Sequence, residues 1–273
     1  MTQDAQTLVA LLKEKQPLAA MVAPSFPIMY KENELIAKLR GIGFTYILEV
    51  AAGAKRTNEA VVKALRDDPN ARFITSPCPS FVRFVRTKYP QYEKYLAEQV
   101  DSPMIATARI AQETYPGYRP VFIGPCNVKK LESSQDYPEL NILVVTYKEL
   151  EEVFAELQAL SGEPGNNAFD VSEISTRIYP YDGGLTDSSG VRDILSDEEI
   201  RIVSGWKACE EALKEFETNP KIRLVDILFC EGGCINGPGV VSTLSLEDRK
   251  KKIQEYYTMS KLRQYASPQS VLE

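Results

Sequence analysis

Four cysteines lie in three short segments whose composition suits metal binding. Cys230 and Cys234 stand four residues apart beside four glycines, Cys78 stands between two prolines, and Cys126 follows a proline. A hydrophobic run precedes each segment, so we expect each thiol at a turn where a strand ends. Thiolates are soft ligands that select zinc, copper(I) or iron–sulfur clusters. The four cysteines could therefore converge on one soft-metal site.

The spacing of these cysteines favours an iron–sulfur cubane over zinc. Structural zinc prefers paired knuckles of closely spaced ligands, and only Cys230 and Cys234 form a close pair. Four thiolates from separate loops suit a [4Fe–4S] cluster. The flanking glycines and prolines shape tight turns whose backbone N–H groups can point at cluster sulfides. Cys209 stands on a helical face without turn residues, and we expect it to be a small buried hydrophobe.

The 273 residues include no histidine. This excludes Ser–His and Cys–His nucleophilic pairs and every histidine-containing zinc site. Proton transfer must then fall to Glu, Asp, Lys, Tyr, Cys or bound water.

Composition excludes two classes of partner. The net charge of −6 and the lack of a basic stripe argue against a nucleic-acid binder. The short basic run 249–252 is expected to be the solvated face of a terminal helix. No apolar run reaches the length of a membrane span, and the polar N-terminus does not resemble a signal peptide. Five cysteines without disulfide-framework spacing indicate reduced thiols in a cytoplasm.

Strand-like runs alternate with helical ones, which predicts an α/β protein with largely parallel sheets. The length allows one large domain or two lobes, and the Gly-, Pro- and Asn-rich segment 161–167 is the best candidate boundary between lobes. Strands are expected at 18–23, 46–51, 72–75, 120–124, 141–145, 200–203 and 224–229. Helices are expected at 32–39, 58–66, 80–88, 104–114, 147–160, 206–216 and 246–257.

The three cysteine segments resemble the signature motifs of the iron–iron ([FeFe]) hydrogenase catalytic domain. That family shows Thr-Ser-Cys-Cys-Pro, Pro-Cys-x-x-Lys-Lys and Cys-x-Gly-Gly-Cys-x-Asn-Gly in this order. Here residues 75–79 read TSPCP, 125–130 read PCNVKK and 230–237 read CEGGCING. The resemblance runs over 18–257 and implies that 1–273 is one catalytic domain of a divergent, sensory-type member. It implies two lobes, each a mostly parallel sheet flanked by helices, with the metal cluster in the cleft between them.

The resemblance also implies the cofactors. Cys78, Cys126 and Cys230 would hold a [4Fe–4S] cubane, together with Cys234, which would bridge to a diiron subcluster. That subcluster carries carbonyl, cyanide and azadithiolate ligands. Because the family needs dedicated maturation proteins for the diiron part, a form that holds only the cubane is also expected.

Further matches concern the surroundings of the diiron subcluster. Lys129 falls where the family's lysine contacts an iron-bound cyanide, and an ammonium complements such an anionic ligand in a dry site. Pro24 and Ser25 resemble the family's loop at the other cyanide. Gly183 and Gly184 lie in a stretch that resembles the loop lining the diiron site.

The resemblance implies molecular hydrogen and protons as substrates, and a redox partner protein or adjoining iron–sulfur domain as electron partner. No cysteine precedes Cys78, so we expect no N-terminal ferredoxin-like domain. A signalling domain beyond Glu273 is a further expectation from the divergent members of the family.

The sequence departs from the family at its proton relay. Pro77 stands where the family has a proton-delivering cysteine, and it carries no titratable group. Glu59 and Arg66 match the relay's first glutamate and its arginine. Val62 and Ala97 replace the second glutamate and the serine. An interrupted relay implies slow turnover.

A rerouted proton path then has to be sought among other residues. The candidates are Glu59, Glu231, Tyr181 and Asp182. Gly124 replaces the family's methionine before Pro-Cys, so we expect looser packing on that side of the diiron site.

Two functional hypotheses follow. The first is a slow or sensory hydrogenase that oxidises hydrogen reversibly to protons and electrons, with Lys129, Cys234 and Glu59 as its functional residues. The second is a non-catalytic hydrogenase-like iron–sulfur protein, active in cluster assembly or electron transfer, that holds only the cubane. Lys129 and Ser25 argue against the second, because they would have nothing to contact.

Overall fold

Two parallel sheets form the framework of the protein. The structure is a computed structural model that describes residues 1–158 and 167–266. One sheet has four strands in the order β2-β1-β4-β5 and the other has three in the order β3-β7-β6. Every pair is parallel, which confirms the predicted architecture. The strands are β1 Leu18–Val22, β2 Tyr46–Glu49, β3 Phe73–Ile74, β4 Arg119–Gly124, β5 Leu143–Thr146, β6 Ile200–Ser204 and β7 Leu224–Leu228.

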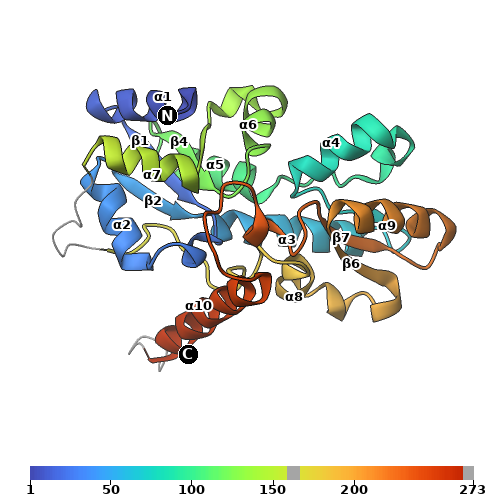
Figure 1. The fold of residues 1–273 in the computed structure, drawn as a ribbon. Coiled ribbons are helices and arrows are strands. Elements are labelled where there is room, and N and C mark those ends of the chain that lie inside the picture. The colour runs from blue at the N-terminus through green and yellow to red at the C-terminus, as the bar shows by residue number, and fades with distance from the viewer. Residues whose placement is uncertain (159–166, 267–273) are drawn as a thin grey trace.

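Helices cover both sheets (Figure 1). Helices α1, α2 and α7 lie around the four-stranded sheet, α4 and α9 lie around the three-stranded sheet, and α10 projects from the middle of the molecule. The helices are α1 Gln3–Lys13, α2 Glu32–Gly41, α3 Val50–Asp67, α4 Pro79–Lys88, α5 Pro103–Thr114, α6 Lys129–Leu131, α7 Tyr147–Glu156, α8 Gly184–Ser189, α9 Trp206–Thr218 and α10 Leu246–Ala266.

The central strands are buried on both faces. All five residues of β1 are buried, as are all five of β7. Helices on both faces of a parallel sheet produce this burial, and it explains why both strands are almost continuous apolar runs in the sequence.

The chain crosses from one sheet to the other in its first half. Strand β3 pairs with β7, so that Phe73 lies opposite Leu224 and Ile74 opposite Val225. The predicted boundary at 161–167 lies almost entirely in 159–166, outside the described residues. No single boundary along the sequence separates the two sheets. Strand β3 belongs to the second sheet, and α4 lies beside that sheet, although both precede β4 and β5 in the chain.

Several helices differ from the predicted elements, among them α8, which was not predicted, and α10, which continues to Ala266 beyond the predicted end at 257. Helix α3 begins at Val50, well before the predicted start at 58, and the strand predicted at 46–51 ends at Glu49. Helix α1 was not among the predictions, although its buried positions have helical spacing and the Thr2 side chain accepts a hydrogen bond from the Ala5 N–H.

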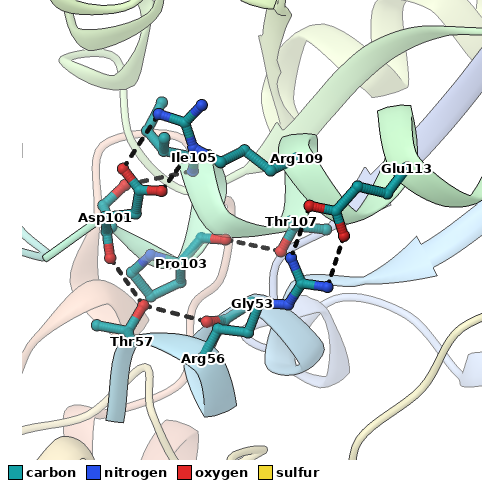
Figure 2. Close-up of polar contacts among 10 residues, drawn as sticks. Gly53, Arg56, Thr57, Asp101, Pro103, Ile105, Thr107, Arg109 and Glu113 are labelled. Atoms are coloured by element: carbon teal, nitrogen blue, oxygen red, sulfur yellow. Dashed lines mark hydrogen bonds and ion pairs between the residues drawn. The ribbon is translucent and has the colours of Figure 1, made fainter. Parts of the chain in front are cut away.

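Helices α3 and α5 cross at very short distance (Figure 2). The Thr57 hydroxyl donates to the carbonyl oxygens of Asp101, at 2.9 Å, and Gly53, at 3.1 Å. A Cβ atom on Gly53 would lie 2.3 Å from the Pro103 carbonyl oxygen and 2.2 Å from Thr107 Oγ1. The crossing therefore requires glycine at position 53.

Replacement of Gly53 by alanine should destabilise the protein. Alanine normally stabilises a helix interior, but here its methyl group overlaps backbone of α5. The expected loss in free energy of unfolding is about 1–3 kcal/mol, by urea denaturation. Glu59→Ala, on the exposed side of the same helix, is the control and should change stability little. An equal effect of both variants would contradict this account.

A buried carboxyl anchors the start of α8. Asp226 on β7 is 3% exposed, and its Oδ2 accepts hydrogen bonds from the Thr186 N–H at 3.0 Å and the Thr186 hydroxyl at 2.9 Å. Burial raises the pKa of Asp226 to about 6, although both hydrogen bonds act to lower it.

This raised pKa predicts a pH dependence of stability. The folded state binds more protons than the unfolded state between about pH 4 and pH 6, so the stabilisation is present at low pH and is lost as pH rises through 6. The loss is about 3 kcal/mol for a shift of about two pKa units. Asp226→Asn keeps the accepting oxygen and should gain by this amount relative to the wild type between about pH 4 and pH 7. The exposed Asp67→Asn should show no such relative gain.

Candidate metal centre

The four predicted ligand cysteines lie at the carboxyl ends of parallel strands. Cys78 follows β3 and caps the N-terminus of α4, Cys126 follows β4, and Cys230 follows β7. Cys234 begins the short 3₁₀ helix Cys234–Asn236. The placement of each thiol at a turn after a strand agrees with the sequence prediction.

The thiols are close enough to affect one another electrostatically. Burial, and then the neighbouring Cys78 and Cys126, raise the pKa of Cys230 to about 12. Burial and the other three thiols raise the pKa of Cys234 well above its usual value. Such thiols keep their protons at neutral pH, so they would have to lose them before acting as thiolate ligands.

This set of thiols is not arranged around a single ion. Within 1–158 and 167–266, no group of three or more His, Cys, Asp or Glu side chains is close enough to hold one metal ion. Each iron of a cubane takes one protein thiolate, so its ligands stand further apart than those of one zinc ion.

The fifth cysteine lies in the core near the other thiols, outside the cavity wall, and burial, followed by Cys78 and Cys230, raises its pKa to about 12. Cys209 is fully buried in the core around α9, and its Sγ lies 3.6 Å from the Leu228 carbonyl oxygen. It packs as the small hydrophobe expected from the sequence.

Glycines allow the last cysteine turn to pack against two other loops. A Cβ on Gly233, where φ is +92°, would lie 2.8 Å from the Pro180 carbonyl oxygen. A Cβ on Gly237 would lie 2.5 Å from the Pro125 carbonyl oxygen. The Gly239 N–H donates to that same oxygen at 2.8 Å. The turn is therefore held backbone to backbone against the Cys126 loop and the loop before α8.

Helix α10 also holds this turn. Arg249 donates to Asn236 Oδ1 at 3.1 Å and to the Ile235 carbonyl oxygen at 3.3 Å. Lys250 forms an ion pair with Asp182 at 3.1 Å. The prediction that 249–252 is only a solvated face was therefore wrong for its first two residues, because they bind polar groups of neighbouring loops.

A cavity of about 550 Å³, including its open part, adjoins the thiols of Cys126 and Cys234. Residues of α3, α5 and β4, whose arrangement Figure 1 shows, form part of its wall. The structure brings five predicted site residues together in its wall, while most of the remaining wall is apolar. These five are Pro24, Ser25, Cys126, Lys129 and Cys234.

Other predicted residues lie elsewhere. Glu59 is exposed on α3, whose cavity side is formed by Val50 and Ala54. Gly183 and Gly184 shape the turn into α8, where a Cβ on Gly184 would lie 2.3 Å from the Ile178 carbonyl oxygen. They support the loop and do not line the cavity.

The remaining candidates for a proton path also lie outside this cavity. Glu231 and Arg66 are exposed, and Asp182 is paired with Lys250. Tyr181 is buried beneath Lys250, whose Nζ lies 4.7 Å from the ring centroid.

The packing expected to be loose at Gly124 is filled. A Cβ at this position would lie 2.5 Å from the ring of Phe122, which also lines the cavity. The expectation failed because the aromatic ring two residues earlier occupies the space of the missing side chain.

Ser25 and Tyr179 are the two hydroxyl-bearing residues of the cavity wall. Tyr147 donates to the Ala23 carbonyl oxygen at 2.7 Å, so Ser25, which is 2.9 Å from the Tyr147 hydroxyl, must donate its own proton there. The Tyr179 hydroxyl is buried without a hydrogen-bond partner. Burial, Asp226 and Cys234 raise the pKa of Tyr179 well above its usual value, so it remains a donor.

Lys129 is the positive charge in the cavity wall. It is 8% exposed, and its Nζ lies 2.6 Å from Glu132 Oε2, 3.0 Å from the Ser102 hydroxyl and 3.1 Å from the Pro77 carbonyl oxygen. The ammonium therefore makes two hydrogen bonds, to Ser102 and Pro77, and an ion pair with Glu132, whose Oε2 accepts no hydrogen bond. Sequence reasoning missed Glu132, although its position three residues after Lys129 on a helix was a usable signal. Ser102 had no local signal.

No helix in the described ranges is both long and apolar enough to cross a membrane.

Three curated relatives cover much of the chain at low identity. Iron hydrogenase 1 of Clostridium pasteurianum is 24% identical over 262 residues, covering 76% of this chain and 45% of that protein. The cytosolic Fe-S cluster assembly factor NAR1 of Encephalitozoon cuniculi (strain GB-M1) is 25% identical over 205 residues, covering 67% and 55%. The probable cytosolic Fe-S cluster assembly factor oxy-4 of Caenorhabditis elegans is 21% identical over 282 residues, covering 82% and 62%. The chain thus spans about half the length of these relatives.

Solved structures share the fold. A variant of the [FeFe]-hydrogenase HydA1 from Chlamydomonas reinhardtii superposes with a TM-score of 0.67 at 16% identity, covering 94% of this chain and 88% of that chain. An [FeFe]-hydrogenase structure from work on oxygen inactivation gives a TM-score of 0.68 with the same identity and coverage. At this identity, the likeness concerns the fold alone.

Residues 16–238 match the family described as the iron only hydrogenase large subunit, C-terminal domain. The match covers most of the chain and includes the four cysteines predicted as ligands and the cavity beside them. The chain therefore belongs to this family of iron-only hydrogenase domains.

Proposed function

We propose that the chain binds a [4Fe–4S] cubane through Cys78, Cys126, Cys230 and Cys234, with a diiron subcluster in the adjoining cavity bridged by Cys234. In this proposal it activates or senses molecular hydrogen, with slow reversible oxidation to protons and electrons. The observation that carries the proposal is the largely apolar cavity whose wall contains both Cys126 and Cys234.

The polar groups of the cavity fit an anionic metal unit. The Tyr179 hydroxyl is a buried donor without a partner. Lys129 supplies a positive charge, and charge-assisted hydrogen bonds to anionic ligands are strong in a dry site. The four thiols are soft donors for iron. The residues present therefore fit both parts of the cofactor.

When bound, the diiron unit would supply hydrogen binding and cleavage, and the cubane would supply electron transfer. The chain's own residues bind and enclose it. Cys234 would tie the two parts together, Lys129 and Tyr179 would orient the anionic ligands, and apolar walls formed by Phe122 and Met104 would exclude water. The ammonium of Lys129 is held by hydrogen bonds to the Ser102 hydroxyl and the Pro77 carbonyl oxygen, and the Pro77 contact, at 3.1 Å, is the longer of the two.

The second candidate is an iron–sulfur protein that holds only the cubane and acts in cluster assembly or electron transfer. Two of the three relatives described above are named as cluster assembly factors. Pro77 also removes the proton-delivering cysteine expected in an efficient hydrogenase. Against this candidate, the cavity and its unpaired Tyr179 donor would serve no ligand.

Partners differ between the two candidates. A hydrogenase would need a redox partner or adjoining iron–sulfur domain and dedicated maturation proteins. A cubane-only protein would need the cluster assembly machinery. In both cases we propose the cytoplasm as location, since two relatives are named as cytosolic proteins.

Cys234→Ala should abolish loading of the diiron subcluster, because the bridge to the cubane is lost. Infrared spectra after maturation with the diiron cofactor should show carbonyl and cyanide bands in the wild type and none in the variant. The matched control is Cys209→Ala, which removes a thiol buried outside the cavity and should keep the bands.

Two results would decide against the hydrogenase proposal or part of it. If the wild type has a spectroscopically intact cubane but no carbonyl or cyanide bands, the second candidate is favoured. If Cys234→Ala retains the bands, the bridging role belongs to another residue.

A further inference from the structure

We infer that helix α10 positions the wall of the cavity beside Cys234, and that Ile253 is the side chain through which it acts. This inference rests on the proposed function, because it treats the cavity as the site of the diiron subcluster. It adds a coupling to that function: occupation of the cavity and docking of α10 on the rest of the protein favour each other.

The cavity wall is assembled from segments that lie far apart in the sequence. Pro24 and Ser25 come from the turn after β1, Tyr179 from the loop before α8, and Cys234 from the turn after β7. None of these segments is a strand or an α-helix. The positions of their side chains relative to one another therefore depend on what packs against the three segments.

A hydrophobic cluster joins the three segments beside the cavity. Each segment contributes one buried isoleucine, which stands three residues after Ser25, directly before Tyr179 or directly after Cys234. These residues are Ile28, Ile178 and Ile235, and Tyr181 packs with them. None of the four lines the cavity itself, so the cluster supports the wall without forming it.

Ile253 is the buried residue that α10 contributes to this cluster. It is 0% exposed, whereas its chain neighbours Lys252 and Gln254 are exposed. Within 246–266, no other apolar side chain is fully buried. The apolar attachment of α10 to the three segments therefore depends mainly on one side chain.

Polar contacts one turn before Ile253 attach α10 to two of the same segments. Besides its contacts with residues 235 and 236, Arg249 donates to the carbonyl oxygens of Ser242, at 2.8 Å, and Leu244, at 3.0 Å. Lys250 holds the loop of Tyr181 through its ion pair with Asp182. These contacts fix the register of the helix on the turn that carries Cys234.

Contacts one turn after Ile253 attach α10 to the remaining segment and again to the loop before α8. The ring of Tyr256 meets the ring of Phe26, which directly follows Ser25, edge to face at 5.2 Å. The guanidinium of Arg177 lies 4.5 Å from the centroid of the same Tyr256 ring. Helix α10 therefore contacts all three wall segments, on both sides of Ile253.

Arg177 is itself rigidly held. It is 5% exposed, forms an ion pair with Glu49 at 2.7 Å, and donates to Glu49 Oε2 at 2.9 Å and to the Ser260 hydroxyl. Glu49 is 0% exposed and ends β2. This chain of contacts links α10 through the loop before α8 to the four-stranded sheet.

These contacts make cavity occupation and helix docking interdependent. A ligand that accepts a hydrogen bond from the Tyr179 hydroxyl while Cys234 holds it binds best when both segments are in place. Docked α10 favours that arrangement, so it strengthens binding. By reciprocity the bound ligand strengthens docking of α10 by the same factor.

Ile253→Ala tests the inference because it removes the apolar attachment and leaves every residue of the wall unchanged. The matched control is Ile36→Ala, which alters an isoleucine that is also 0% exposed and helical but packs in the core of the four-stranded sheet, outside the cavity wall. Arg249→Ala is a second variant that leaves no buried void. Its control is Lys251→Ala, on the exposed side of the same helix.

The first measurement is hydrogen exchange by mass spectrometry on the full chain before the diiron subcluster is loaded. In Ile253→Ala, amides of 178–181 and 234–237 should exchange at least about tenfold faster than in Ile36→Ala. Arg249→Ala should accelerate exchange at 234–237, whereas Lys251→Ala should not. Ile253→Val should recover most of the wild-type protection.

The second measurement uses the matured protein. Loading of the diiron subcluster in the wild type should slow exchange of amides at 250–257 by at least about fivefold. In infrared spectra, Ile253→Ala should shift or broaden the carbonyl and cyanide bands, and Ile36→Ala should keep them as in the wild type. Ile253→Val should restore the wild-type bands.

The outcomes separate this inference from the proposed function. If the wild type shows no carbonyl or cyanide bands, the proposed function fails, and exchange before loading still decides whether α10 positions the wall. Equal exchange at 178–181 and 234–237 in Ile253→Ala and Ile36→Ala would overturn the positioning role. If Ile253→Ala does not fold, unchanged exchange at 234–237 in Arg249→Ala overturns it instead. Bands that load without slower exchange in α10 would overturn the coupling.

Discussion

Three loops meet backbone to backbone at the carboxyl ends of two parallel sheets. The turn after β7 reaches within contact distance of the Pro180 and Pro125 carbonyl oxygens only because Gly233 and Gly237 have no side chains. Any larger residue there would push the loops apart by its own Cβ. This close packing fixes where Cys230 and Cys234 stand relative to the Cys126 loop, although the loops come from strands of different sheets.

The same packing determines the character of the cavity. Because the loops are held together by backbone contacts, their side chains are free to form an apolar wall with few polar groups. Ser25 and Lys129 are already engaged with the protein, whereas the Tyr179 hydroxyl has no partner. A buried donor without a hydrogen bond costs about 1–3 kcal/mol of free energy. A ligand that accepts a hydrogen bond from this hydroxyl would recover that free energy on binding.

Local patterns were sufficient to predict the strands and the four thiol turns. A short apolar run such as Leu224–Leu228 that is followed by glycines usually forms a buried strand that ends in a turn. The pairing of β3 with β7 could not be predicted, since it joins residues about 150 positions apart. Glu59 was misplaced for a related reason. Helix α3 begins at Val50, and its buried side is set by packing on α5, so Thr57 and Asn58 face inward and Glu59 faces solvent. The sequence motif predicted Lys129, but its contact with Ser102 depends on tertiary structure.

Lys129 is where the structural and functional demands meet. A lysine that is only 8% exposed needs a counter-charge, and Glu132 supplies it. Removing both charged groups from water costs free energy, and this cost often exceeds the attraction between them. A protein that held only a cubane could fill this wall with apolar side chains at no loss. An anionic unit in the first cavity changes that balance, because it gains from the ammonium directly. The hydrogenase proposal therefore gives the buried ammonium a ligand in the cavity, whereas the cubane-only alternative leaves it with its protein partners alone.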